Sequence, residues 1–94
     1  MIRVVVIYDI TNNKKRRLVS DILEGYGTRV NKSVFECELK SEKQKQHLIK
    51  ELKAIFDPKT DSIRIYKLCQ TCIANALELG KHPEPFDRDS VFWI

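Results

Sequence analysis

The sequence lacks any long apolar run. Its apolar start, residues 2–7, is too short and too β-branched for a signal peptide, and the acidic residue Asp9 follows almost at once. No stretch approaches the roughly 20 apolar residues that a membrane helix needs. We therefore expect a cytoplasmic protein with no membrane partner.

Cysteine is scarce, with three residues in the chain, and without an export signal these indicate reduced thiols. Cys69 and Cys72 invite a zinc interpretation, but zinc needs four ligands, and only Cys37, His47 and His82 could complete the set. A redox Cys-x-x-Cys pair opens a helix after a strand, which fits this segment in part. We interpret the two cysteines as a packed structural pair.

Glycine and suitably placed aromatic residues are also few. With three glycines there is no glycine-rich ligand loop, so a small-molecule sensor lacks support. The RNA-recognition fold carries stacking aromatics on its central strands, and here only Phe35 could stack on a base.

What the chain does have is the composition of one small basic domain. Its 94 residues can bury only a modest core, which favours oligomerisation. Lys and Arg number 17 against 13 Asp and Glu, a formal net charge of +4. That total is a weak sign of a nucleic-acid partner, but the cations cluster tightly at residues 14–17.

The apolar spacing predicts strands and helices in the order β-α-β-β-α-β. The strands are expected at residues 2–8, 29–31, 34–39 and 62–68, with helices from about residue 13 to 25 and 42 to 56. This is an α+β, ferredoxin-like sandwich with two helices on one face of an antiparallel sheet. The first strand is so uniformly β-branched that we expect it to be central and covered on both faces.

Local signals support the two helices. The first should bury a stripe that includes Leu18, Val19 and Leu23, and Gly25 and Gly27 should supply the conformations that end it. The second should open at the capping box that begins at Ser41 and ends at Gln44.

Residues 1–68 form the predicted core, and residues 69–94 form a C-terminal extension of the same domain. The extension should contain a short helical piece at residues 73–79, a proline-punctuated connector and the apolar end SVFWI. Termini fray unless they are held, so we expect this end to add a strand to a sheet edge of the same chain or of a second copy.

Lys14, Lys15, Arg16 and Arg17 lie at the start of the first helix, where each cation opposes the helix dipole at a cost of about 0.3–1 kcal/mol. A solvated charge run is the alternative, but a bound phosphate would turn the unfavourable placement into a favourable one. Helical spacing points Lys15 toward Asp9 and Arg17 toward water. We therefore predict a patch that grips a nucleic-acid backbone.

Asp9 ends the first strand beside this helix start. A carboxylate there could hold Mg²⁺, which often takes one or two protein carboxylates and keeps its waters. The alternatives are that Asp9 caps the helix or pairs with Lys15. One carboxylate makes a poor metal site, and a twofold axis close to Asp9 would supply a second.

The segments VIYDI, YGTRV, SVFEC and IRIYKLC, together with the cations at 14–17, resemble the Cas-two family of CRISPR-associated proteins. The resemblance runs in order over residues 2–72. It implies a ferredoxin-like homodimer that takes part in spacer acquisition, bridges dimers of the Cas-one integrase and holds a prespacer DNA duplex. It also implies a Mg²⁺-dependent endonuclease or endoribonuclease in which Asp9 is the catalytic and metal-binding residue.

The same resemblance implies that Tyr8, Ser33 and Phe35 support the cleft, and that the C-terminal strand pairs with the partner protomer. Two positions depart from the family pattern. Asn31 stands where Gln is usual and Leu18 where a further cation is common. DNA binding is then expected to depend more on three other cations: Arg64, Lys67 and Lys81.

Two functions remain open. In one, the dimer is a Mg²⁺-dependent phosphodiesterase acting on DNA or single-stranded RNA. In the other, it is a non-catalytic scaffold that holds prespacer duplex DNA for the integrase.

Overall fold

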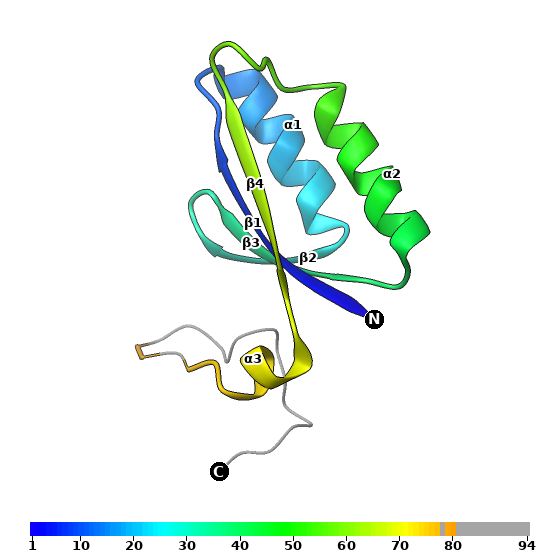
Figure 1. Cartoon of the computed structure of the whole chain (residues 1–94). Helices are drawn as coiled ribbons and strands as arrows, with labels where there is room; N and C mark the ends of the chain where they lie inside the picture. The colour runs from blue at the N-terminus through cyan, green and yellow to red at the C-terminus, as the bar shows by residue number, and fades with distance from the viewer. Residues whose placement is uncertain (78, 81–94) are drawn as a thin grey trace.

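The computed structural model describes residues 1–77 and 79–80. Its elements are β1 (Ile2–Asp9), α1 (Asn13–Glu24), β2 (Gly27–Asn31), β3 (Val34–Leu39), α2 (Glu42–Lys53), β4 (Ser62–Leu68) and α3 (Gln70–Ala74) (Figure 1). The four strands form one antiparallel sheet in the order β2-β3-β1-β4. The predicted β-α-β-β-α-β order and ferredoxin-like class are therefore confirmed.

Figure 1 shows α1 and α2 side by side against the same face of the sheet. The core lies between them and the strands because every second residue of β1 and β3 points toward the helices. Its buried members are Val4, Val6, Tyr8, Ile10, Val19, Leu23, Phe35, Cys37, Leu39, Leu48 and Leu52.

The prediction for β1 is half right. The strand is central, but within the described residues the helices cover only one of its faces. Val5 is half-buried and Ile7 is 38% exposed on the other face. We call this second face, to which Arg3, Val5, Ile7 and Asp9 contribute from β1, the open face. Its apolar residues explain why the sequence of this strand is typical of a fully buried one.

Helix α1 begins at its N-cap Asn12, whose side chain accepts a hydrogen bond from the Lys15 amide at 2.9 Å. The predicted stripe needs one correction, since Leu18 is 45% exposed. The predicted role of the glycines also differs. Gly25 caps α1 with an ordinary right-handed φ of −75°, and Gly27 is already the first residue of β2.

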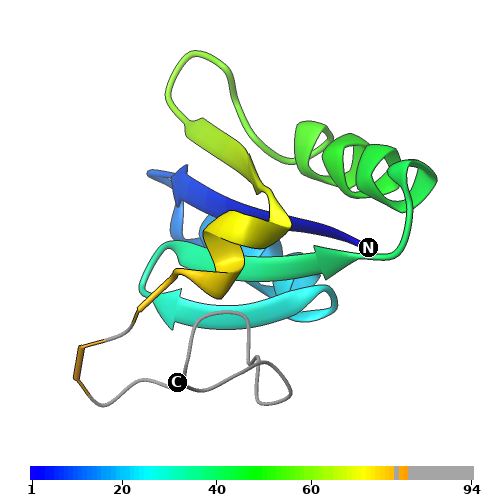
Figure 2. The ribbon, with the colours of Figure 1, turned by 60° about the horizontal axis from the view of Figure 1, so that its bottom comes forward.

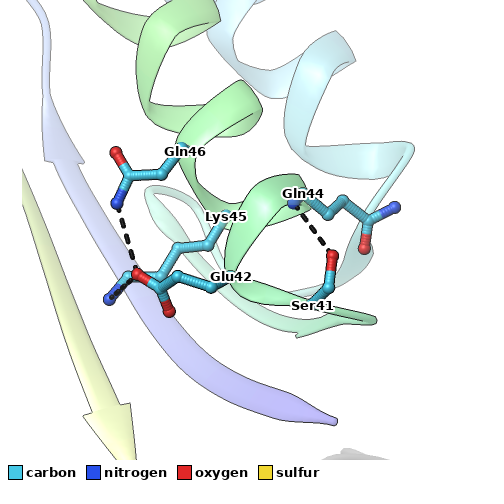
Figure 3. A network of polar contacts seen from close by, with 5 residues as sticks. All are labelled: Ser41, Glu42, Gln44, Lys45 and Gln46. Atoms are coloured by element: carbon cyan, nitrogen blue, oxygen red, sulfur yellow. Dashed lines mark hydrogen bonds and ion pairs between the residues drawn. The ribbon is translucent and has the colours of Figure 1, made fainter.

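Helix α2 begins as predicted, with the Ser41 hydroxyl accepting from the Gln44 amide at 3.2 Å (Figure 3). The Gln44 side chain returns to the amide of Lys40, one residue before the cap. Glu42 then contacts Lys45 at 3.8 Å and Gln46 at 3.2 Å along the first turn. The helix ends at Lys53, a few residues earlier than expected.

After β4 the chain enters α3 (Figure 2). A helix was predicted at residues 73–79, and this was wrong: α3 spans Gln70–Ala74 because the Cys69 side chain caps it by accepting from the Cys72 amide. The predicted strand at residues 90–94 and the basic residue Lys81 lie outside the described residues, and the division between core and extension stays a prediction. None of the helices in the described part of the chain is long and apolar enough to cross a membrane.

Candidate nucleic-acid interface and carboxylate site

Asp9 is the last residue of β1, where its Cα pairs with that of Ser62 in β4. Its carboxylate lies on the open face and is exposed. Among residues 1–77 and 79–80 it makes no hydrogen bond and no ion pair. The two alternative roles are contradicted, because Asn12 caps α1 and no Asp9–Lys15 ion pair is formed within these residues.

A hollow of about 640 Å³ opens where the C-terminal end of β1, the first turns of α1 and the β2–β3 turn meet. Its lining contains four cations and no carboxylate from the described residues. The residues are Tyr8, Asn13, Arg16, Arg17, Ser20, Arg29, Lys32 and Ser33. We call this the basic hollow. Four positive side chains and four polar groups without an acid favour an anionic ligand.

Two of its guanidinium groups are held in place. Arg16 donates to the Ile10 carbonyl at 3.0 Å and to the side chain of Asn13. Arg29 donates to the Lys32 carbonyl at 3.0 Å and to the Ser20 hydroxyl. A guanidinium has five N–H donors, so each retains donors for a phosphate oxygen.

Tyr8, Ser33 and Phe35 lie beneath and beside these cations. The Tyr8 hydroxyl donates to the Lys32 carbonyl at 3.2 Å, and its amide donates to the Ser33 carbonyl at 3.0 Å. The Tyr8 and Phe35 rings stack with centroids 6.3 Å apart, and the Arg29 guanidinium lies 5.2 Å from the Phe35 centroid. Both rings are buried, so in their predicted cleft-supporting role they would pack beneath the cations and would not contact a ligand.

The structure divides the four predicted cations of α1. Arg16 and Arg17 line the basic hollow, whereas Lys14 and Lys15 do not. Lys15 is half-buried beside Asp61, and its charge contributes to the lowered pKa of that carboxyl group. Asp61 lies at the end of the sheet where Asp9 emerges, so the predicted direction of Lys15 stays a prediction, while no ion pair between Lys15 and Asp9 forms within the described residues.

Sequence reasoning missed Arg29 and Lys32 as cations of this site. The sequence analysis did not include the register in which β2 pairs with β3. Arg29 pairs with Phe35 across β2 and β3, and Lys32 occupies the turn between the same strands. A hairpin register that placed Arg29 opposite Phe35 would have brought it to the end of the sheet where Asp9 emerges.

The open face around Asp9 carries apolar side chains. Ile7, two residues before Asp9, is 38% exposed, and Tyr66 of β4 is 47% exposed. Tyr66 pairs with Val5 across the two strands, and Val34 pairs with Ile7 on the other side. Ile7 and Tyr66 therefore lie on the same face as the exposed carboxylate of Asp9, where Arg64 pairs with Ile7 and Glu36 pairs with Val5.

The family model described as CRISPR associated protein Cas2 matches residues 1–76 of this sequence. The chain belongs to the Cas2 family. One relative, "CRISPR-associated endoribonuclease Cas2 1" of Chloroflexus aurantiacus, is 36% identical over 89 residues, which cover 95% of this chain and 96% of the relative.

Solved structures of the Cas2 family share the fold. A Cas2 crystal structure from Streptococcus pyogenes matches with a TM-score of 0.74 at 35% identity, covering 83% of this chain and 99% of that one. A chain of a partial Cas6-RT-Cas1–Cas2 complex matches with a TM-score of 0.72 at 28% identity, covering 84% and 91%.

A magnesium ion is expected from the resemblance, and the donor chemistry can be tested against it. Magnesium prefers oxygen ligands and often takes one or two carboxylates with several waters. Within the described residues, Asp9 offers one exposed, unpartnered carboxylate, and no group of three or more side chains there could hold a metal. Among the described residues, Asp9 is therefore the carboxylate of this site that one chain would offer to such an ion.

Proposed function

We propose that this chain acts as a homodimer that binds nucleic acid and hydrolyses a phosphodiester with Mg²⁺ held between two copies of Asp9. The observation that carries the proposal is the exposed Asp9 carboxylate, unpartnered among the described residues, which directly follows Tyr8, a residue of the acid-free lining of the basic hollow. Relatives named CRISPR-associated endoribonucleases support a nuclease activity in general.

The dimer follows from the open face. Burying Ile7 and Tyr66 against a second copy would remove apolar surface from water, at about 25 cal/mol for each Å². A twofold contact uses the same patch on both copies, so residues near the axis meet their own equivalents. Asp9, two residues from Ile7 on that face, would then supply the second carboxylate.

The residues of the chain would share the work in the following way. Arg17 and Lys32 bind phosphate oxygens of the backbone, while the anchored Arg16 and Arg29 fix the position of those phosphates. The paired Asp9 carboxylates would hold the metal ion. When bound, the ion supplies a Lewis acid for the phosphoryl oxygen and a water of lowered pKa.

The test is removal of the carboxylate without removal of the dimer. Asp9→Asn should lose Mg²⁺ binding in calorimetry and lose cleavage of single-stranded RNA or duplex DNA. Its mass in light scattering should stay that of a dimer, because an amide of the same shape replaces the acid. Asp21→Asn, a matched change at an exposed aspartate of α1, should retain all three properties.

If Asp9→Asn still cleaved nucleic acid, the proposed role of Asp9 would be rejected. The second function, a scaffold that holds duplex DNA for the Cas1 integrase, would then remain. That alternative is favoured by the match to a chain of the Cas6-RT-Cas1–Cas2 complex. It predicts that Asp9→Asn still forms a complex with Cas1 and duplex DNA on a sizing column.

A further inference from the structure

The two cysteines of the Cys69-x-x-Cys72 segment are exposed, so their interpretation as a packed structural pair was wrong. Their sulfur atoms lie 3.1 Å apart and share a hydrogen bond, and the Cys72 amide donates to the Cys69 sulfur at 3.3 Å. A disulfide bond measures about 2.05 Å, so closing it requires the sulfurs to approach by about 1 Å. Small side-chain rotations can supply that movement.

We propose that Cys69 and Cys72 form a reactive dithiol, which anionic low-molecular-mass disulfides oxidise to an intrachain disulfide. The site is separate from the one proposed around Asp9. In the sheet register Leu68 pairs with Arg3 and Ser62 pairs with Asp9, so the dithiol and the carboxylate lie at opposite ends of β1 and β4.

Cys69 is the attacking group. The side-chain hydrogen bond that the two sulfurs share is the largest cause that lowers the pKa of Cys69, and the same bond is the largest cause that raises the pKa of Cys72. A thiolate, not a thiol, attacks a disulfide, so the sulfur with the lower pKa reacts first. The third cysteine, Cys37, is fully buried, and burial raises its pKa to about 12.

The exchange balances in two steps. The Cys69 thiolate attacks one sulfur of the small disulfide, forming a mixed disulfide and releasing one small thiolate, which takes a proton from water. Cys72 then loses its proton to solvent and attacks the Cys69 sulfur, releasing the second small thiolate. The protein dithiol is oxidised by two electrons and the small disulfide is reduced to two thiols.

The surroundings of Cys69 indicate the charge of the oxidant. A hollow of about 480 Å³ beside it is lined by Met1, Arg3, Lys67, Leu68, Cys69, Gln70 and Ile73, with no carboxylate among these described residues. Arg3 is paired with Glu38 at 2.8 Å, which reduces its effect on a ligand. Lys67 makes no ion pair within the described residues and is the cation that would attract a carboxylate-bearing disulfide.

The first experiment identifies the product. The reduced full-length chain is treated with oxidised glutathione and its intact mass is measured. We expect a product lighter by two hydrogen atoms, with Cys37 as the only cysteine that a maleimide labels after unfolding. Recovery of all three labelled cysteines, or of disulfides between chains, would overturn the proposal.

The second experiment assigns the roles of the two sulfurs. Cys72→Ser should trap the mixed disulfide on Cys69, and Cys69→Ser should form one on Cys72 about tenfold more slowly at neutral pH. Equal rates in the two variants would contradict the assignment of Cys69 as the attacking group. Both variants retain the buried Cys37, so an adduct on that residue would report unfolding and is measured in the same digest.

The third experiment tests the charge of the ligand. Lys67→Glu should slow oxidation by glutathione disulfide and speed oxidation by the cationic disulfide cystamine, whereas Lys59→Glu, at the opposite end of β4, should change neither rate. Identical behaviour of the two lysine variants would refute the preference for anionic disulfides. Mg²⁺ binding, which depends on Asp9, should be the same in the oxidised and reduced protein.

Discussion

At the scale of single residues, Asp61 joins two loops at the end of the sheet where Asp9 emerges. Its carboxylate accepts hydrogen bonds from the Asp57 amide at 2.9 Å and from the Thr11 amide at 3.3 Å. The hydrogen bond from Asp57 is the first cause of its lowered pKa, with Thr11, Thr60 and the charge of Lys15 adding to it. Asp61 therefore connects the β1–α1 loop to the loop before β4.

This carboxylate gives a pH-dependent prediction. A group whose pKa is lowered in the folded protein adds stability above its unfolded pKa, about 3.9 for aspartate, and loses it as the pH falls through the folded value. Urea unfolding should thus find Asp61→Asn less stable than the wild type near neutral pH. The difference should shrink below about pH 4. A difference that stays constant over this range would contradict the role given to the charge.

At the scale of elements, β2 lies against the backbone of β3 at Gly27, which pairs with Cys37. A Cβ atom at Gly27 would lie 2.0 Å from the Glu36 carbonyl oxygen and 2.6 Å from the Cys37 Cα. Both are backbone atoms that cannot turn aside. The close approach fixes the hairpin that carries Arg29 and Lys32 into the basic hollow.

We expect Gly27→Ala to lower the free energy of unfolding by about 3 kcal/mol, because backbone must shift to admit the methyl group. Gly25→Ala is the matched control. Its added Cβ meets only the Ile22 carbonyl oxygen, at 3.3 Å, and the loss should stay within about 1 kcal/mol. Chemical denaturation measures the free energy of unfolding of both variants. Equal losses of stability would show that the close contact between Gly27 and β3 does not restrict the side chain at this position.

At the scale of the whole molecule, the proposed nucleic-acid site and the proposed dithiol lie at opposite ends of the sheet within the described residues. The basic hollow and Asp9 occupy the end of β1 that precedes α1, and the dithiol lies beyond the other end. The exposed Lys40 and Lys43 lie near the dithiol end, since Leu39 pairs with Ile2. Nucleic-acid binding should therefore depend on cations at one end only.

Salt dependence measures this asymmetry. Arg17→Gln and Lys32→Gln should each reduce the slope of log affinity against log salt by about 0.9 on duplex DNA for each phosphate that the native side chain neutralises. Lys40→Gln and Lys43→Gln, which remove the same charge far from the hollow, should leave the slope unchanged. Equal slopes in all four variants would remove the basic hollow from the interface.

Much of this architecture could be predicted because its signals are local. Alternation and helical spacing predicted the element order, and the capping box at Ser41 predicted the start of α2. The Cas2 resemblance was likewise carried by contiguous segments such as VIYDI and SVFEC. Misplacement of α3 arose because its cap is a cysteine, and a thiol is a weak and uncommon N-cap.

The sequence by itself determined the class of fold, the central place of β1 and the presence of an acid next to four cations, since these follow from neighbouring residues. The tertiary structure alone decided which cations share a surface. It placed Lys15 where its charge lowers the pKa of Asp61, brought Arg29 and Lys32 beside Arg16 and Arg17, and left the Asp9 carboxylate without a partner among the described residues. The reason is physical: strand register and helix docking join residues far apart in the chain, and no local pattern specifies those distances.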